Sequence, residues 1–208
     1  MTSEDTAGSA IRRAADVMRF LRAWLERPRQ VGAVLPSGSA LAQLITSQIL
    51  PTRGGVIELG PGTGVFTRAL LDRGVRECDL TLVEANEHFA EALRTTFPAV
   101  RLLQCDAGRL DARDLAPGRP IGAVVSGLPL LNMPLRQVFA IVATAFGHLD
   151  DGGALYQFTY GRRCPVPRPI LDRLGLKAVI VGRTLRNMPP ATVYRISRRP
   201  PLRLGSHS

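Results

Sequence analysis

The chain has 208 residues, 45% of them hydrophobic, which indicates one globular domain with a sizeable core. No stretch approaches the roughly 18 uninterrupted apolar residues of a transmembrane helix, and arginines interrupt the apolar residues of the N-terminus, unlike a secretory signal. The three cysteines lack metal-ligand spacing, so we expect reduced thiols in a cytoplasmic protein without a metal site. The formal net charge of +10 indicates an anionic partner, and nucleic acid and an anionic membrane surface both fit.

The first predicted element is an amphipathic helix over residues 10–27. Apolar side chains that include Trp24 fill one half of its helical wheel, and arginines that include Arg12, Arg19 and Arg22 fill much of the other. Such a helix is suited to a membrane interface, where its arginines are drawn to anionic lipid. The alternative is ordinary packing of the helix on a sheet. We therefore name these three arginines and Trp24 as candidate membrane contacts.

A second helix is predicted after a loop at 32–39. Ser37 or Ser39 caps this helix, which runs to about Leu50. We assign residues 1–50 to an N-terminal helical extension that binds a membrane or forms a lid.

Strands and helices then alternate, which predicts an α/β fold with a parallel sheet and helices on both faces. Strands are expected at 55–59, 79–83, 100–104, 122–126, 153–160, 177–184 and 191–197. Helices are expected at 65–73, 87–97, 134–149 and 168–174. These elements form the predicted main domain, residues 51–198, and a basic tail follows at 199–208.

The strongest motif is V-I-E-L-G-P-G-T-G at residues 56–64. An apolar strand ends there in a glycine turn, and glycine permits backbone conformations and a close ligand approach that other residues do not. The spacing does not fit G-x-G-x-x-G, with which a dinucleotide site seats a pyrophosphate. It resembles the first motif of the class I S-adenosylmethionine-dependent methyltransferases, whose loop faces the amino-acid moiety of the cofactor. A glycine turn without a ligand is the alternative.

The resemblance implies a Rossmann-like fold whose seven-stranded sheet is mostly parallel with one antiparallel strand. It also implies S-adenosylmethionine as the cofactor and S-adenosylhomocysteine as its product. The implied cofactor contacts are Glu58, Gly60, Pro61, Gly62 and Gly64 in the first motif, Glu84 and Ala85 at the ribose, Asp106 and Ala107 at the adenine, and Ser126, Gly127 and Leu128 beside the reactive methyl group. Taken singly, Glu84 fits a solvated strand end, and Asp106 or Asn86 fits a helix cap.

Two hypotheses divide on the methyl acceptor. S-G-L-P-L-L-N at 126–132 resembles the acceptor motif of amino-methyltransferases, which reads N-L-P-Y in RNA adenine dimethyltransferases. With a basic chain, RNA methylation is therefore a serious hypothesis. The sequence departs from that motif because Ser126 replaces the asparagine and Leu130 stands where the stacking aromatic is expected. We also expect no C-terminal helical RNA-binding domain and no nucleic-acid partner.

The chain is more similar to the bacterial phospholipid N-methyltransferases, which convert phosphatidylethanolamine to phosphatidylcholine. The similarity lies in G-A-V-L-P-S at 32–37, the glycine motif, S-G-L-P-L-L-N, Y-Q-F-T-Y-G at 156–161 and N-M-P-P-A-T-V-Y-R-I at 187–196. It implies three successive methylations of one amine, through mono- and dimethyl lipids. We expect a monomer in solution that binds peripherally to the inner face of the cytoplasmic membrane.

Methyl transfer requires an aligned amine and the exclusion of water rather than a nucleophilic side chain or a metal. The candidate catalytic residues are Ser126, Tyr156 and Tyr160. Tyr156, Phe158 and Tyr160 occupy every second position of one predicted strand, so their side chains point the same way. Their ring faces suit a methylated cation. Core packing is the alternative role for these rings.

Arg162 and Arg195 are candidate contacts for the phosphate of a lipid headgroup. Their alternative role is that of ordinary solvated side chains. A third hypothesis for the whole chain is a membrane-bound binding module that keeps the fold without catalysis.

Overall fold

The computed structural model describes residues 36–200, except residues 112, 114–119, 162, 186 and 188. These residues belong to a compact unit that begins at Pro36. The α-helices are α2 (Pro36–Thr46), α3 (Val65–Asp72), α4 (Glu87–Thr96), α5 (Leu135–His148) and α6 (Arg168–Arg173). The strands are β1 (Gly55–Leu59), β2 (Leu80–Val83), β3 (Arg101–Leu103), β4 (Ile121–Ser126), β5 (Leu149–Thr159), β6 (Leu176–Thr184) and β7 (Ala191–Arg198). One-turn helices lie at η1 (Glu77–Asp79), η2 (Ala107–Arg109) and η4 (Leu130–Asn132).

Within the described residues, seven strands form one sheet in the order β3-β2-β1-β4-β5-β7-β6. Strand β7 is antiparallel to both of its neighbours, and the other neighbouring pairs are parallel. This confirms the predicted fold class. The chain moves outward from β1 to β2 and β3, and then returns to β4 on the other side of β1. Because ligands of open α/β sheets bind at the carboxyl ends of strands where the order reverses, the site is expected beside the ends of β1 and β4.

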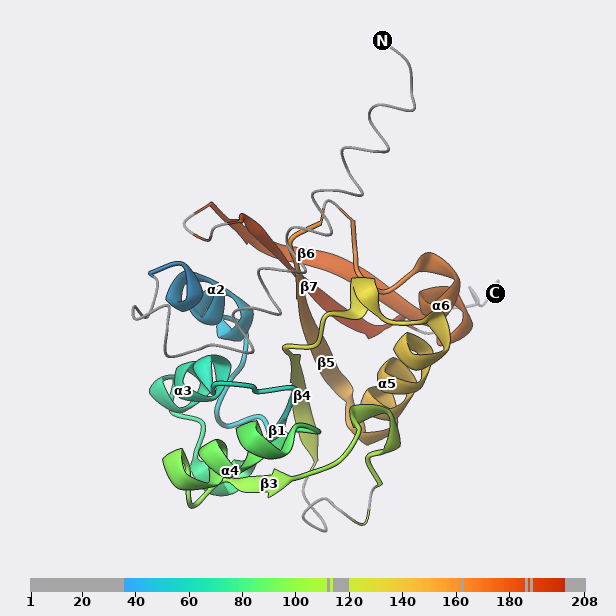
Figure 1. Cartoon of the computed structure of the whole chain (residues 1–208). Coiled ribbons are helices and arrows are strands. Elements are labelled where there is room, and N and C mark those ends of the chain that lie inside the picture. Colours follow the sequence, from blue (N-terminus) through green and yellow to red (C-terminus); the bar gives the residue numbers. More distant parts are fainter. Residues whose placement is uncertain are drawn as a thin grey trace, which may run out of the picture. The chain divides into compact units, whose positions relative to one another are not determined.

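Helices cover both faces of the sheet (Figure 1). On one face, α3 and α4 contribute Leu70 and Leu93 to a core that includes Val56 of β1. On the other face, α5 contributes Ile141 to a core that includes Ile57. Val56 and Ile57 face opposite cores because side chains alternate along a strand. Strand β1 is therefore buried on both sides, as its continuous apolar run predicts.

Helix α2 differs from its prediction at both ends. It begins at Pro36, so Ser37 and Ser39 lie inside the helix and the predicted cap is wrong. Proline suits the first helical position because no N–H donor is needed there. After Thr46 the chain continues in short i→i−3 turns rather than in an α-helix. Helix α2 packs into the core of the main domain, whereas the predicted boundary at residue 50 grouped it with the N-terminal extension.

Strand β5 begins at Leu149, earlier than predicted. The D-D-G-G segment that follows is typical of a turn, but Leu149 already pairs with Ile121 of β4 before the register shifts. At the end of β7, the Arg198 guanidinium donates to the carbonyl oxygens of Phe146, Leu149 and Asp150. Arg198 thus ties β7 to the junction between α5 and β5.

Several predictions concern residues outside those described. They are the helix over 10–27 with Arg12, Arg19, Arg22 and Trp24, the side chain of Arg162, and the tail after residue 200. In the described part of the chain, no helix is long and apolar enough to cross a bilayer.

Candidate functional site

The glycine turn follows β1, at the edge of the sheet that the topology indicates. Gly60, Gly62 and Gly64 have φ angles of 67°, 55° and 78°, in the left-handed region that favours glycine. A Cβ atom at Gly60 would lie 2.6 Å from the Leu128 side chain, and one at Gly64 would lie 2.6 Å from the Phe97 ring. The turn therefore needs glycine for its packing as well as for its conformation.

Backbone hydrogen bonds hold this turn in place. The Gly60 N–H donates to the carbonyl oxygen of Val83 at the end of β2, at 2.9 Å. The Gly64 N–H donates to the Pro61 carbonyl oxygen, also at 2.9 Å, and closes the turn before α3. The turn is thus positioned against β2 by the protein itself.

Glu84 follows β2 and reaches the same turn. One carboxylate oxygen accepts the Gly62 N–H at 3.1 Å, and the other accepts the Asn86 N–H at 2.8 Å. The side chain of Asn86 accepts the Phe89 N–H and caps α4, so the cap interpretation of Asn86 is confirmed. Although Glu84 is only 8% exposed, each of its oxygens retains a further lone pair for a ligand. Ala85, between Glu84 and Asn86, is exposed at this edge.

Glu58 lies inside β1 and is fully buried. One carboxyl oxygen accepts from the Thr67 hydroxyl at 2.7 Å, and the other, Oε1, has no hydrogen-bond partner. Burial raises the pKa of Glu58 from 4.5 to about 8, against the lowering effect of the Thr67 hydrogen bonds. A buried acid with an unused acceptor beside a glycine turn suits a cationic ligand group, which would favour the carboxylate.

Asp106 lies just beyond β3, at the same edge of the sheet. Its side chain accepts the Gly108 N–H at 2.7 Å and caps η2, which begins at the buried Ala107. The helix-cap role of Asp106 is therefore confirmed. Because the residue is exposed, its second oxygen is accessible to a ligand.

The acceptor motif S-G-L-P follows β4 and packs against the glycine turn. The buried Ser126 hydroxyl accepts the Leu128 N–H at 3.3 Å. The Gly127 N–H donates to the Leu59 carbonyl oxygen at 2.8 Å, and a Cβ atom at Gly127 would lie 2.5 Å from the carbonyl oxygen of Gly60. When Leu128 and Pro129 are aligned with the Leu-Pro pair of N-L-P-Y, the asparagine of that motif falls at Gly127. The sequence prediction that Ser126 replaces the asparagine was therefore wrong. No side chain fits at Gly127.

Three aromatic rings gather near the same edge. Phe158 of β5 contacts Tyr160 at a centroid distance of 5.3 Å and Phe66 of α3 at 5.8 Å, both edge to face. Burial raises the pKa of Tyr160, while its hydrogen bond to Asn187 opposes that rise. Phe66 was not predicted as a site residue, because an apolar residue in the first turn of a helix usually packs in the hydrophobic core. Its place directly after the glycine turn was the available signal.

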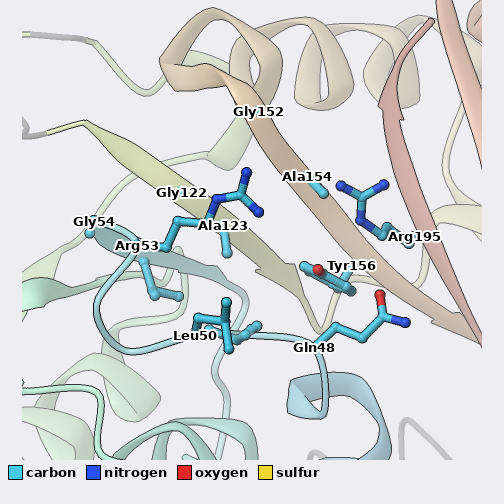
Figure 2. Close-up of a pocket in the computed structure, with 13 residues that line it drawn as sticks. Gln48, Leu50, Arg53, Gly54, Gly122, Ala123, Gly152, Ala154, Tyr156 and Arg195 are labelled. Atoms are coloured by element: carbon cyan, nitrogen blue, oxygen red, sulfur yellow. The ribbon is translucent and has the colours of Figure 1, made fainter. Parts of the chain in front are cut away.

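Tyr156 and Arg195 lie together. The two residues pair across β5 and β7 and line a pocket with Arg53 at the starts of β1, β4 and β5 (Figure 2). Tyr156 also pairs with Val125 of β4, one residue before Ser126, so it lies where this pocket approaches the carboxyl ends of the strands. Tyr156 packs in the same hydrophobic core as Phe66, Phe158 and Tyr160, and Tyr160 follows β5 at the same end as the glycine turn. In the described part of the chain, no cluster of His, Cys, Asp or Glu could hold a metal ion.

Comparison with protein-family models finds no match. Among curated proteins, the chain is 29% identical over 190 residues to the ornithine lipid N-methyltransferase of Singulisphaera acidiphila, across 86% of this chain and 94% of that protein. Shorter segments match ribosomal RNA small subunit methyltransferases A. Identity is 34% over 74 residues with the protein of Chlorobium phaeobacteroides and 32% over 95 residues with that of Maridesulfovibrio salexigens. These segments cover 36% and 46% of this chain, but only 27% and 35% of the two relatives.

Solved structures of low sequence identity share the fold. Magnesium protoporphyrin IX methyltransferase (ChlM) from Synechocystis PCC 6803, with bound SAM, has a TM-score of 0.60 at 13% identity, over 96% of this chain and 99% of that chain. The glycopeptide N-methyltransferase MtfA, complexed with sinefungin, has a TM-score of 0.59 at 15% identity, over 78% and 94%. The chain thus has the class I S-adenosylmethionine-dependent methyltransferase fold. The ligands in these two structures agree with the cofactor predicted from the sequence.

Proposed function

We propose that the chain is an S-adenosylmethionine-dependent lipid N-methyltransferase that converts phosphatidylethanolamine, through its mono- and dimethyl forms, to phosphatidylcholine. The observation that carries the lipid class is the extent of the match to the ornithine lipid N-methyltransferase, which spans 86% of this chain. The ribosomal RNA methyltransferases match less than half of it. The ornithine headgroup is the second candidate acceptor, because both lipids offer a primary amine beside an anionic group.

The site residues fit the cofactor chemically. The unused Oε1 of Glu58 suits the ammonium of the methionine moiety, and Glu84 suits the ribose hydroxyls. The exposed oxygen of Asp106 suits the adenine amine. S-adenosylmethionine, when bound, supplies an electrophilic methyl group on a sulfonium. The task of the chain is then to align a neutral amine with that group and to exclude water.

The aromatic rings suit the products of this reaction. Each methylation adds apolar surface to a headgroup amine, and the trimethylated product carries a permanent positive charge. The faces of Phe66, Phe158 and Tyr160 would attract such a cation, in addition to their packing against one another.

Exposed leucines at the same edge support the proposal of a membrane surface as partner. Leu131 and Leu135 follow the acceptor motif and are 54% and 65% exposed. Leu185 is 84% exposed and follows β6, which runs parallel to β5 because both are antiparallel to β7. These three leucines would enter the lipid interface of the inner face of the cytoplasmic membrane, with the proposed helix at 10–27 as a further anchor.

Methylation of ribosomal RNA adenine is the alternative function. The local matches to the two RNA methyltransferases favour it. The absence of room for a side chain at Gly127 disfavours it, because the N-L-P-Y motif needs an asparagine there.

The test is transfer of radiolabelled methyl groups to three acceptors, namely phosphatidylethanolamine vesicles, ornithine lipid vesicles and total RNA. We expect label in phosphatidylethanolamine, and label in ornithine lipid alone would change the headgroup assignment. Label in RNA without label in lipid would overturn the proposal. Glu84→Ala should abolish transfer, whereas Glu87→Ala, at an exposed position on α4, should retain it. No transfer by the wild-type protein to any of the three acceptors would favour the non-catalytic binding module.

A further inference from the structure

The acceptor motif lacks the polar side chain that an amine needs beside the methyl group. At Gly127, a Cβ atom would lie 2.5 Å from the Gly60 carbonyl oxygen, which excludes a longer side chain. The hydroxyl of Ser126 is fully buried and already accepts the Leu128 N–H. A polar side chain that accepts from a primary amine at this motif therefore has to come from another element.

Gln157 lies on the neighbouring strand at the matching position. It is the residue of β5 that pairs with Ser126 of β4. Its side-chain Nε2 donates to the Leu128 carbonyl oxygen at 3.0 Å and to the Phe158 carbonyl oxygen at 3.0 Å. The amide thereby fixes the backbone of the acceptor motif from the adjacent strand.

The other end of the same amide is unused. Gln157 is 1% exposed, and its Oε1 has no hydrogen-bond partner although it is buried. Buried amide oxygens in folded proteins are ordinarily paired, so the Oε1 of Gln157 has an open acceptor position that a water molecule or a ligand group can fill. The two acceptors of Nε2 also fix the orientation of the amide, because both are carbonyl oxygens and only the NH₂ group can donate to them.

We propose that Gln157 is the acceptor-binding residue of this enzyme, with its Oε1 accepting an N–H of the lipid amine while its Nε2 holds the Leu128 carbonyl. In the N-L-P-Y motif the asparagine side chain provides this amide from the end of β4, whereas in this protein Gln157 provides it from β5. This inference rests on the proposed lipid N-methyltransferase function.

The chemistry gives the inference a specific signature. In each step the lone pair of a neutral amine forms the new C–N bond while the C–S bond breaks with its electrons left on sulfur. After the first and second steps the resulting ammonium loses a proton to water, and the third step gives a quaternary ammonium that has no proton to lose. A neutral primary amine has two N–H groups, its monomethyl form has one, and its dimethyl form has none. Gln157 Oε1 therefore aligns the first two acceptors and has no N–H to accept from the third.

The decisive variant is Gln157→Met, which keeps the volume of the side chain and removes both polar atoms. We expect kcat/KM for phosphatidylethanolamine and monomethyl-phosphatidylethanolamine to fall by about tenfold or more, the scale of one lost hydrogen bond in a buried site. For dimethyl-phosphatidylethanolamine, the fall in kcat/KM should be at least about threefold smaller, because this acceptor loses only the support that Nε2 gives to the Leu128 backbone. An equal loss on all three lipids, or no loss on any, would overturn the inference.

A binding measurement separates positioning from general damage. In the presence of S-adenosylhomocysteine, Gln157→Met should weaken the binding of short-chain phosphatidylethanolamine and leave that of short-chain phosphatidylcholine, which has no N–H, unchanged. Ser197→Ala, at a buried polar residue of β7 that pairs with Lys177, is the matched control and should leave all of these values unchanged. Wild-type protein that methylates no lipid would overturn the proposed function itself. Active wild-type protein with an unselective Gln157→Met defect would overturn only the role of Gln157.

Discussion

The backbone N–H of Gly62 donates to the carboxylate of Glu84 at 3.1 Å, which joins the glycine turn and the end of β2 in one hydrogen-bonded unit. Both carboxylate oxygens of Glu84 are used, since the second accepts from Asn86. An amide has only one acceptor oxygen, so Glu84→Gln would turn an NH₂ group towards one of the two donors. The carboxylate therefore organises the turn as well as offering lone pairs to a ligand.

We expect Glu84→Gln to weaken S-adenosylhomocysteine binding by roughly 10- to 100-fold, the scale of a lost hydrogen bond to a charged group. Isothermal titration calorimetry measures this directly. Glu87→Gln, at an exposed position in the first turn of α4, is the matched control. Equal affinity of Glu84→Gln and wild type would show that Glu84 does not contact the cofactor.

The buried Glu58 should make stability depend on pH. Its pKa is about 8 in the folded protein, above the 4.5 of an exposed glutamate, so its contribution to stability is complete below pH 4.5 and is lost as the pH rises through about 8. Glu58→Gln has no such titration. The free energy of unfolding, measured by urea denaturation, should therefore fall more between about pH 5 and pH 8 in wild type than in Glu58→Gln. Parallel pH profiles would contradict the raised pKa.

The same carboxyl group should release a proton when the cofactor site fills. At pH 7 a group with a pKa of about 8 is mostly protonated, and a nearby ammonium favours its charged form. Binding of S-adenosylhomocysteine should thus release up to about one proton, detected by calorimetry in buffers of different ionisation enthalpy. Glu58→Gln should release none, and proton release that persists in this variant would point to another group.

The glycine turn allows a controlled test of packing against backbone strain. Gly64 and Gly175 have φ angles of 78° and 65°, so alanine is similarly strained at both. A Cβ atom at Gly64 would meet the Phe97 ring, whereas a Cβ atom at Gly175 would have no neighbouring atom within 4 Å. We expect Gly64→Ala to lower the free energy of unfolding by about 1–3 kcal/mol more than Gly175→Ala does. Equal losses would mean that Phe97 moves away without cost.

Tyr156 of β5 and Tyr160, which follows β5, should behave differently. Tyr160 packs on Phe158 near the acceptor motif, so Tyr160→Leu should weaken the binding of dimethyl-phosphatidylethanolamine by roughly 3- to 30-fold. Tyr156 lines the pocket with Arg53 and Arg195, and Tyr156→Phe keeps the ring and removes only the hydroxyl, so this variant should retain lipid methylation. Methylation kinetics of both variants decide between these roles. A strong defect in Tyr156→Phe alone would support the catalytic assignment made from the sequence.

Most of the fold could be predicted from periodicity and glycine placement. The apolar run of β1 and the helical patterns of α3, α4 and α5 appear in the structure close to their predicted bounds, because each is set by local burial and turn chemistry. The start of β5 could not be predicted in this way. Its D-D-G-G segment has turn composition, and only pairing with β4 extends the strand to Leu149.

The candidate site was predictable where one residue type is required by local geometry. The positive φ angles of the glycine turn require glycine, so the motif was visible in the sequence. The role of Gln157 could not be predicted from the sequence, because a polar residue between Tyr156 and Phe158 is typical of the solvent-facing side of an alternating strand. Only the crossover that places β5 beside β4 shows that this side is buried against Leu128.

The insertion of β7 between β5 and β6 has a consequence for how the molecule is made. Strand β6 pairs only with β7 within the described sheet, and β7 comes after it in the chain. On the ribosome, β6 therefore has no partner until residues 191–198 have emerged, and until then β5 is an open edge. Strand β5, which carries Gln157 and Phe158, therefore gains its second neighbouring strand last. A chain interrupted before β7 would contain every cofactor residue named above, but its β5 would still have an unpaired edge.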